Sequence, residues 1–289
     1  MMNKPTIIIT GANGFLGKCL VDYFRAKKWR VKAFVHNLLK EKYDDVVYIK
    51  YDMKEDIEPT YFEDVDFLVH AAYLRYEKDS NADEINLEGT RNIVAICEQK
   101  SIKVAFLSSF SAHDEAISHY GITKLRCEKL FDLEKDVVLK IGFIIGEEGI
   151  LSEMINRMKT SPIFPLVGGG VQPLQSIYIQ DLLEVVEKTL VANELSGIFK
   201  VAHHEVITMK SFYKELASRL GRRLLFIPIP TYVLYIACKI FEGIGLKIPI
   251  SSESVLGLRK LIALDTKGDQ KRIGVKLRSY QEGLDIILK

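Results

Sequence analysis

The sequence predicts an α/β fold, a doubly wound parallel Rossmann sheet with a small, mostly helical C-terminal substrate cap. Short runs rich in Val and Ile alternate with helical stretches through the first half of the 289-residue chain. These runs lack polar alternation, which is typical of strands buried on both faces of a parallel sheet. Between the first run and the first helical stretch, Gly11, Gly14 and Gly17 repeat every three residues, as in a turn that binds phosphate.

The individual elements follow from these patterns in chain order. Strands are predicted at residues 7–9, 31–35, 46–51, 67–69, 104–107 and 137–145, and helices at residues 15–27, 82–99 and 120–133. This alternation predicts a dinucleotide-binding domain over residues 1–146, with right-handed crossovers. A strand and helix within residues 174–192 are expected to return to the same sheet. Residues 147–173 and 193–289, punctuated by Pro and Gly, are expected to form the small substrate-binding region.

Composition excludes several classes of function. Forty basic and 38 acidic residues give a formal charge of +2 without a basic block, which argues against nucleic-acid binding. The cysteines are widely spaced, form no Cys-x-x-Cys pair and fall in predicted helices: Cys19, Cys97, Cys127 and Cys238. We therefore expect reduced thiols, a cytoplasmic location and no metal site. The N-terminus enters a strand pattern directly, with no leader of the secretory type.

Residues 232–246 are apolar enough to require a test for a membrane span. Lys239 and Glu242 interrupt the segment, which is shorter than the roughly 20 apolar residues that a span needs. No membrane span is expected. A buried or an interfacial helix is the simplest interpretation, and peripheral contact with a membrane stays open.

The glycine-rich turn is the first candidate binding site. The first glycine permits a tight turn, the second lets the backbone approach a pyrophosphate, and the third lets the helix pack on the strand. The N-terminus of the following helix offers unpaired N–H groups to the phosphates. The cofactor-binding candidates in this segment are Gly11, Asn13, Gly14, Phe15, Leu16 and Gly17.

Two strand ends bear on the adenosine half of a dinucleotide. Asp52, followed by Met53, ends the third strand, where a carboxylate can accept a hydrogen bond from the adenine amino group. His36 ends the second strand, where an NAD-preferring protein usually places an acidic residue. The missing carboxylate and the nearby Lys40 and Lys42 favour NADP over NAD. The alternative is a solvent-facing His36 that has no effect on cofactor choice.

A tyrosine and a lysine four residues apart, Tyr120 and Lys124, lie on one face of a predicted helix. The lysine can hydrogen-bond the nicotinamide ribose and lower the phenol pKa from about 10, so that the phenol serves as a general acid and base. A hydroxyl should hold the reacting oxygen of the substrate. Ser108, Ser109 and Ser111, directly after a buried strand, are the three candidates.

In order and spacing, these motifs resemble those of the extended short-chain dehydrogenases/reductases, the NAD-dependent epimerase/dehydratase family, which acts largely on nucleotide sugars. The resemblance extends to His70-Ala71-Ala72, Asn86-Leu-Glu-Gly-Thr90, Ser108-Ser109 and Lys140-Ile-Gly-Phe-Ile-Ile-Gly146. It implies that Ser109 is the catalytic hydroxyl beside Tyr120 and Lys124. The further positions it implies near the cofactor are Ala71, Ala72, Asn86, Phe143 and Ile144, and the substrate-binding candidates are Ser111, His113 and Gln175.

The departures from the family pattern shape the predicted function. Lys140-Ile141 stands where the family has Arg-Pro, and only ten residues separate Ser109 from Tyr120. Phe110 and Ser111 stand where a dehydratase commonly has Asp-Glu, which favours an epimerase or a reductase. We therefore expect an NAD(P)-dependent oxidoreductase or epimerase that acts on a hydroxyl or keto group of a nucleotide-linked sugar.

Alternatives to this function remain open. One is a reductase or dehydrogenase of a non-sugar ketone or alcohol, whose pocket the apolar residues 224–246 would suit. Another is a non-catalytic dinucleotide-binding subunit. The family resemblance also implies a homodimer that pairs through the helices predicted at residues 82–99 and 120–133.

Overall fold

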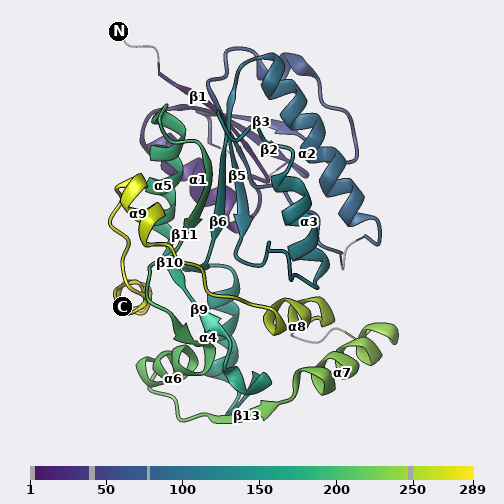
Figure 1. The fold of residues 1–289 in the computed structure, drawn as a ribbon, viewed down its shortest axis with the longest axis vertical. Coiled ribbons are helices and arrows are strands. Elements are labelled where there is room, and N and C mark those ends of the chain that lie inside the picture. The colour runs from purple at the N-terminus through teal and green to yellow at the C-terminus, as the bar shows by residue number, and fades with distance from the viewer. Residues whose placement is uncertain (1–3, 39–42, 77–78, 247–249) are drawn as a thin grey trace.

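A parallel sheet of seven strands forms the centre of the computed structural model, which describes residues 4–38, 43–76, 79–246 and 250–289. Its strand order is β11–β6–β5–β4–β1–β2–β3 (Figure 1). The strands are β1 (Thr6–Thr10), β2 (Arg30–Val35), β3 (Val46–Lys50), β4 (Phe67–His70), β5 (Lys103–Ser109), β6 (Val137–Ile141) and β11 (Gly197–Val201). The chain builds the sheet outward in both directions from β1 and β4, which confirms the predicted doubly wound fold.

Helices cover both faces of this sheet (Figure 1). One face packs against α1 (Phe15–Ala26) and α5 (Ile179–Val191), and the other against α2 (Ala82–Gln99), α3 (His119–Glu128) and the short helix η1 (Pro59–Phe62). Successive residues of β1 illustrate why an unbroken apolar run is required. Ile7 and Ile9 enter the core under α1 and α5, Ile8 enters the core under α2, and all three are fully buried.

The remaining elements form the cap at the carboxyl ends of the strands and the return to the sheet (Figure 1). The cap contains two small sheets, in which β13 pairs with β8 and β12 with β9. Its elements are α4 (Ile150–Thr160), β8 (Ile163–Val167), η3 (Gly168–Gly170), β9 (Pro173–Leu174), β12 (Ile207–Thr208), α6 (Met209–Arg219), β13 (Leu225–Ile229), α7 (Thr231–Gly243) and α8 (Ser252–Arg259). The chain then returns along the sheet as α9 (Lys267–Ile273) and α10 (Tyr280–Ile287).

The strand predicted over residues 137–145 is interrupted at Gly142, where the chain leaves the main sheet. A Cβ atom at Gly142 would lie 2.5 Å from the carbonyl oxygen of Gln175, so this crossing requires glycine. Beyond it, β7 (Phe143–Ile145) pairs with β10 (Ser176–Tyr178) in a separate two-stranded sheet. The strand that extends the main sheet beside β6 is β11 rather than the one expected within residues 174–192.

The apolar residues 224–246 do not form a single buried helix. They contain β13 and α7, and Cys238 is the only residue of α7 that is buried. Within the described parts of the chain, no helix combines the length and the apolar character needed to cross a bilayer. All four cysteines are free thiols and lie within helices, as predicted.

The start of α1 packs directly on the turn that follows β1. A Cβ atom at Gly17 would lie 2.2 Å from the carbonyl oxygen of Gly11 and 2.7 Å from Cα of Ala12. Both neighbours are backbone atoms and cannot move aside as a flexible side chain could. Helix α1 can therefore lie this close to the turn only with glycine at position 17.

We expect Gly17→Ala to lower the free energy of unfolding by about 1–3 kcal/mol or more, because overpacking displaces backbone. Chemical denaturation of the two proteins measures the difference. Gly268→Ala is the matched control, since Gly268 lies in α9 with nothing within 4 Å of its added Cβ. It should be neutral or stabilising by up to about 1 kcal/mol. Equal midpoints for Gly17→Ala and the wild type would contradict the close approach.

Candidate active site

The turn between β1 and α1 forms a cradle of backbone atoms. Gly11 has a φ of 67°, and its carbonyl accepts a hydrogen bond from the N–H of Gly14 at 2.9 Å. A Cβ atom at Gly11 would lie 2.8 Å from the backbone of Ala72, so the turn and the end of β4 touch. Gly14 precedes α1 and no side chain caps its first turn. The N–H groups of the first turn of α1 are therefore available to an anion such as a pyrophosphate.

A buried chain of hydrogen bonds fixes the strand ends beside this cradle. Thr10 Oγ1 accepts from the N–H groups of Ala71 and Ala72 at 3.1 Å each and lies 2.8 Å from His70 Nδ1. His70 Nε2 lies 3.1 Å from Thr90 Oγ1. With two donors already on its oxygen, Thr10 must donate to Nδ1, which leaves Nε2–H to donate to Thr90. Burial lowers the pKa of His70 to about 3, so the ring stays neutral.

The side chain of Asn86 is hydrogen-bonded to the loop over residues 71–76. This side chain is buried, accepts from the N–H of Leu74 at 2.8 Å, and donates to the carbonyls of Leu74 and Ala82 at 2.7 Å each. All of these bonds are to main chain. The structure therefore places Asn86 as the support of the loop that follows Ala71 and Ala72.

The predicted adenosine contacts lie together at the ends of β2 and β3. His36 Nδ1 is 3.4 Å from Asp52 Oδ2, and the His36 side chain is 66% exposed. The other carboxylate oxygen of Asp52 accepts from the N–H of Lys54 at 3.0 Å. Lys40 and Lys42, which contributed to the predicted preference for NADP, lie outside the described residues.

Asn13 carries an unused acceptor in the glycine-rich turn. Its amide nitrogen donates to the carbonyl of Asn37 at 2.7 Å. Its oxygen Oδ1 is buried and has no partner among the described residues. Met53, which follows Asp52, fills the space over Gly89, where an added Cβ would lie 2.8 Å from the Met53 Cβ. An unsatisfied buried acceptor beside an uncapped helix N-terminus fits a ligand that bears hydrogen-bond donors as well as anionic groups.

The predicted catalytic residues meet between α3 and the end of β5. The Ser109 hydroxyl lies near enough to the Tyr120 phenol to lower its pKa, and it accepts from the N–H of Ser111 at 3.1 Å. Lys124 Nζ donates to the carbonyl of Leu107 at 2.7 Å. Helix α3 thus presents Tyr120 and Lys124 on the face that contacts β5.

Burial and nearby polar or charged groups shift the pKa values of Lys124 and Tyr120. Lys124 is only 4% exposed, and burial lowers the pKa of its ammonium to about 8. Tyr120 is 38% exposed as a residue, yet the protein around its hydroxyl desolvates that group and raises its pKa. The neighbouring Ser109 hydroxyl and the charge of Arg75 lower the pKa of Tyr120. A nearby positive charge would strengthen that lowering.

Two residues of the 71–76 loop join the site without having been predicted. The Tyr73 ring meets the Tyr120 ring edge-on, with centroids 5.0 Å apart, and Lys124 Nζ lies 5.1 Å from the Tyr73 centroid. Arg75 acts on Tyr120 through its charge. Their place within four residues of Ala71 was the only signal in the sequence.

Lys140, which replaces the family's arginine, belongs to a buried network behind Ser109. Its ammonium lies 3.0 Å from the carboxylate of Glu128 and donates to the carbonyl of Ala112. Glu128 also accepts from the hydroxyl of Ser108 at 2.5 Å. Lys140 therefore connects α3 to the loop that follows Ser109.

Two of the three substrate-binding candidates fasten the cap. His113 Nε2 lies 2.8 Å from the carbonyl of Lys260. The Gln175 amide donates to the carbonyl of Leu264 at 3.0 Å and accepts from its N–H at 2.8 Å. The third candidate, Ser111, stands between Ser109 and His113 in the sequence, and its hydroxyl takes no part in these hydrogen bonds.

The remaining cofactor-binding candidates, Phe143 and Ile144, lie on β7. Phe143 is half-buried, its N–H donates to the carbonyl of Gln175 at 2.8 Å, and Ile144 packs against the core. The Phe15 ring occupies the space that a side chain at Gly146 would fill, since an added Cβ there would lie 2.6 Å from it. The glycine-rich turn is thereby held against the end of β7.

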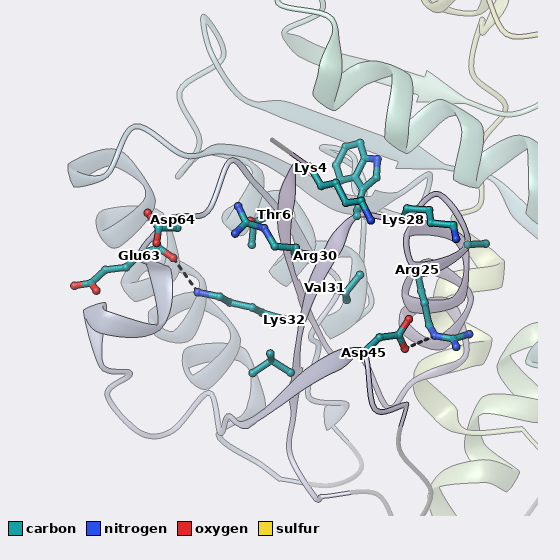
Figure 2. A pocket seen from close by; sticks show the side chains of 13 residues that line it. Lys4, Thr6, Arg25, Lys28, Arg30, Val31, Lys32, Asp45, Glu63 and Asp64 are labelled. Atoms are coloured by element: carbon teal, nitrogen blue, oxygen red, sulfur yellow. Dashed lines mark hydrogen bonds and ion pairs between the residues drawn. The ribbon is translucent and has the colours of Figure 1, made fainter. Parts of the chain in front are cut away.

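A surface depression among the described residues lies elsewhere, at the amino ends of the strands (Figure 2). It measures about 660 Å³, and basic side chains from β2 and the end of α1 line it. Asp45 binds Arg25 at 2.6 Å, and Lys32 donates to the carbonyls of Tyr61 and Glu63 at 2.9 Å each. Because ligands of doubly wound sheets bind at the carboxyl ends of the strands, this depression is not the candidate active site.

Comparison with known proteins identifies relatives of this chain. UDP-N-acetylglucosamine 4,6-dehydratase (inverting) of Campylobacter jejuni is 24% identical over 185 residues, which are 55% of this chain and 54% of that protein. The chain thus spans about half the length of the curated relatives it matches.

Solved structures share the fold over nearly the whole chain. MoeE5 in complex with UDP-glucose and NAD has a TM-score of 0.76 at 17% identity, covering 98% of this chain and 97% of MoeE5. UDP-N-acetylglucosamine 4-epimerase from Methanobrevibacter ruminantium M1, in complex with UDP-N-acetylmuramic acid, has a TM-score of 0.75 at 16% identity, covering 99% and 97%.

A match to a family model shows which protein family the chain belongs to. The model of the NAD dependent epimerase/dehydratase family matches residues 7–202, from the first strand through the last strand of the main sheet. The chain therefore belongs to the NAD-dependent epimerase/dehydratase family.

Proposed function

We propose that the protein is an NAD(P)-dependent enzyme acting at a hydroxyl or keto group of a nucleotide-linked sugar. The observation that supports it best is the meeting of Ser109, Tyr120 and Lys124 in a fold whose glycine-rich turn can hold a pyrophosphate. A purely binding subunit has no use for such a phenol. The relatives named above as acting on or binding UDP-sugars favour a nucleotide sugar as the substrate.

The residues present fit a dinucleotide. The backbone cradle of Gly11, Gly14 and Gly17 would hold the pyrophosphate, the unpaired Oδ1 of Asn13 offers an acceptor, and Asp52 would accept from the adenine amino group. NAD(P), when bound, supplies a hydride acceptor or donor. Asn86 and Thr10 contribute indirectly, because they position the loop that borders the cradle.

In this proposal, Tyr120 removes the proton of the substrate hydroxyl and returns it in the reverse direction. The Ser109 hydroxyl hydrogen-bonds the reacting oxygen and keeps it next to the phenol. Lys124, with its pKa near 8, is mainly an ammonium at neutral pH and favours the phenolate through its charge.

We favour epimerisation or reduction over dehydration. Elimination of water needs an acid and a base next to the catalytic hydroxyl, and the two positions after Ser109 carry Phe110, which is 4% exposed, and Ser111. Dehydratases are nonetheless among the relatives, so this preference concerns the residues of this chain alone.

Cofactor preference, assembly and location complete the proposal. His36 in place of an acidic residue favours NADP over NAD. A cytoplasmic homodimer that pairs through α2 and α3 fits the side-by-side packing of these helices (Figure 1) and the exposed Ile122 on α3.

Tyr120→Phe should reduce turnover by about a hundredfold or more, because it removes the group that transfers the proton. Dinucleotide affinity, measured by fluorescence titration, should stay nearly unchanged. Tyr61→Phe is the control, since Tyr61 is 37% exposed and lies in η1, away from the site. Full turnover in Tyr120→Phe would refute the catalytic assignment.

A thermal-shift screen of UDP-, GDP- and dTDP-sugars, each with NAD(H) or NADP(H), tests the substrate class. A ligand at a hundredfold excess over its Kd stabilises the folded protein by about 2.7 kcal/mol, which raises the melting temperature measurably. We expect at least one nucleotide sugar to do so. Stabilisation by the dinucleotide but by no sugar nucleotide would transfer the proposal to a non-sugar ketone or alcohol.

His36→Asp should shift cofactor preference toward NADH, because a carboxylate repels the 2′-phosphate of NADPH and can bind the ribose hydroxyls. The ratio of the two dissociation constants should change by roughly tenfold or more, as expected for a like charge placed beside a phosphate. His204→Asp, an exposed histidine beyond β11, should leave the ratio unchanged. A wild-type protein that already prefers NADH would disprove the NADP assignment.

A further inference from the structure

Helix α7 exposes an apolar stripe to solvent. Along it, residues three or four positions apart share one side of the helix: Tyr232, Val233, Ile236, Ile240 and Ile244, which are 66%, 43%, 54%, 59% and 65% exposed. The opposite side carries the buried Cys238 and packs against α8. Figure 1 shows α7 projecting from the cap, at the end of the molecule away from the main sheet. A surface helix normally presents polar residues to water, so this stripe needs an explanation.

The strand before α7 exposes apolar residues as well. Alternate residues of β13, Leu225 and Ile227, are 62% and 38% exposed. Ile163, the partner of Leu225 on β8, is 45% exposed. Only Pro230 separates β13 from α7. We refer to the α7 stripe together with these three residues as the apolar face.

Basic residues outnumber acidic ones on α7 and in the residues just before β13. Glu242 is the only acidic residue of α7, and both of its carboxylate oxygens bind Ser252 on α8, at 2.7 Å to the N–H and 2.8 Å to the hydroxyl. Lys239 is exposed on α7, and Arg222 and Arg223 are exposed just before β13. A symmetric pair of copies would bring two faces of the same sign together. An anionic surface is the complementary partner.

We propose that α7 and β13 dock the protein onto a membrane surface that contains anionic lipids. An apolar helix face edged with aromatic and basic residues is the pattern of helices that lie in the plane of the bilayer interface. The stripe would enter the headgroup–acyl boundary, and Lys239, Arg222 and Arg223 would contact lipid phosphates. The proposal depends on the apolar face and its charges, and it holds whatever the catalysed reaction is.

The docked face would lie close to the candidate active site. Helix α8 carries α7 on one side, and on the other its Glu253 accepts a hydrogen bond from the N–H of His119 at 2.7 Å. His119 directly precedes Tyr120. A membrane contact at α7 is thus separated from the candidate catalytic tyrosine by one helix.

Flotation with lipid vesicles tests the proposal on the full-length protein. The protein should float with vesicles of phosphatidylcholine mixed with phosphatidylglycerol, more weakly with phosphatidylcholine alone, and less as salt is added. Replacing both Ile236 and Ile240 by Glu should weaken binding by about tenfold or more, and Arg223→Ala by about fivefold. All three positions are exposed, so the melting temperature and dinucleotide affinity should be retained.

A matched control uses an apolar residue on a distant helix. Val191→Glu changes a residue that is 52% exposed on α5 and should float like the wild type. A Tyr232→Trp variant, whose fluorescence should shift to shorter wavelength on adding vesicles, gives a measure independent of the double variant. Absence of flotation, or equal flotation of the double variant, overturns the proposal. The proposal is also overturned if the protein self-associates without binding vesicles and the double variant abolishes that self-association.

Discussion

The buried hydroxyl of Thr10 ties together the two strand ends on which the candidate site is built. It lies where β1 and β4 run side by side, and it satisfies the N–H groups of Ala71 and Ala72 while donating to His70. Removing it would leave these two part-buried N–H groups without their partner, at a cost of up to about 1–3 kcal/mol each. Because the folded pKa of His70, about 3, lies below the ordinary 6.5, the unfolded state gains a proton first, and this part of the stability is lost as the pH falls below about 6.5.

The loop over residues 71–76, which begins at the N–H groups bound by Thr10, contacts both the glycine-rich turn and the candidate catalytic residues. Its first residues touch Gly11, Asn86 holds it through Leu74, and the Tyr73 ring meets the Tyr120 ring. The glycine-rich turn and the phenol are therefore both held by this loop, although 108 residues separate Gly11 from Tyr120 in the sequence. A pyrophosphate bound at the turn and a substrate bound at the phenol would be positioned against the same loop. This shared support explains how groups from distant segments keep a fixed spacing.

The features that could be predicted from the sequence are those set by local patterns, and the features that could not are those set by long-range contacts. Buried strands and the Tyr120–Lys124 spacing are local patterns, and both were visible without tertiary information. The break at Gly142 was not, because it depends on the carbonyl of Gln175, far along the chain. Tyr73 carries no motif of its own, since its place beside Tyr120 is set by the hydrogen bonds of Asn86. The sequence thus revealed the groups that carry chemistry and missed those whose position depends on long-range contacts.

The contacts of the cap bear on substrate specificity. Three side chains fasten it by binding main chain across long distances, His113 to Lys260, Gln175 to Leu264, and Glu253 to the residue before Tyr120. None of these bonds uses Ser109, Tyr120 or Lys124. A change in the segment that contains α8 can therefore reshape the space over the phenol and leave the reacting groups where they are. In such an arrangement the chemistry is set by the sheet and the loop at its edge, and the choice of substrate by the cap.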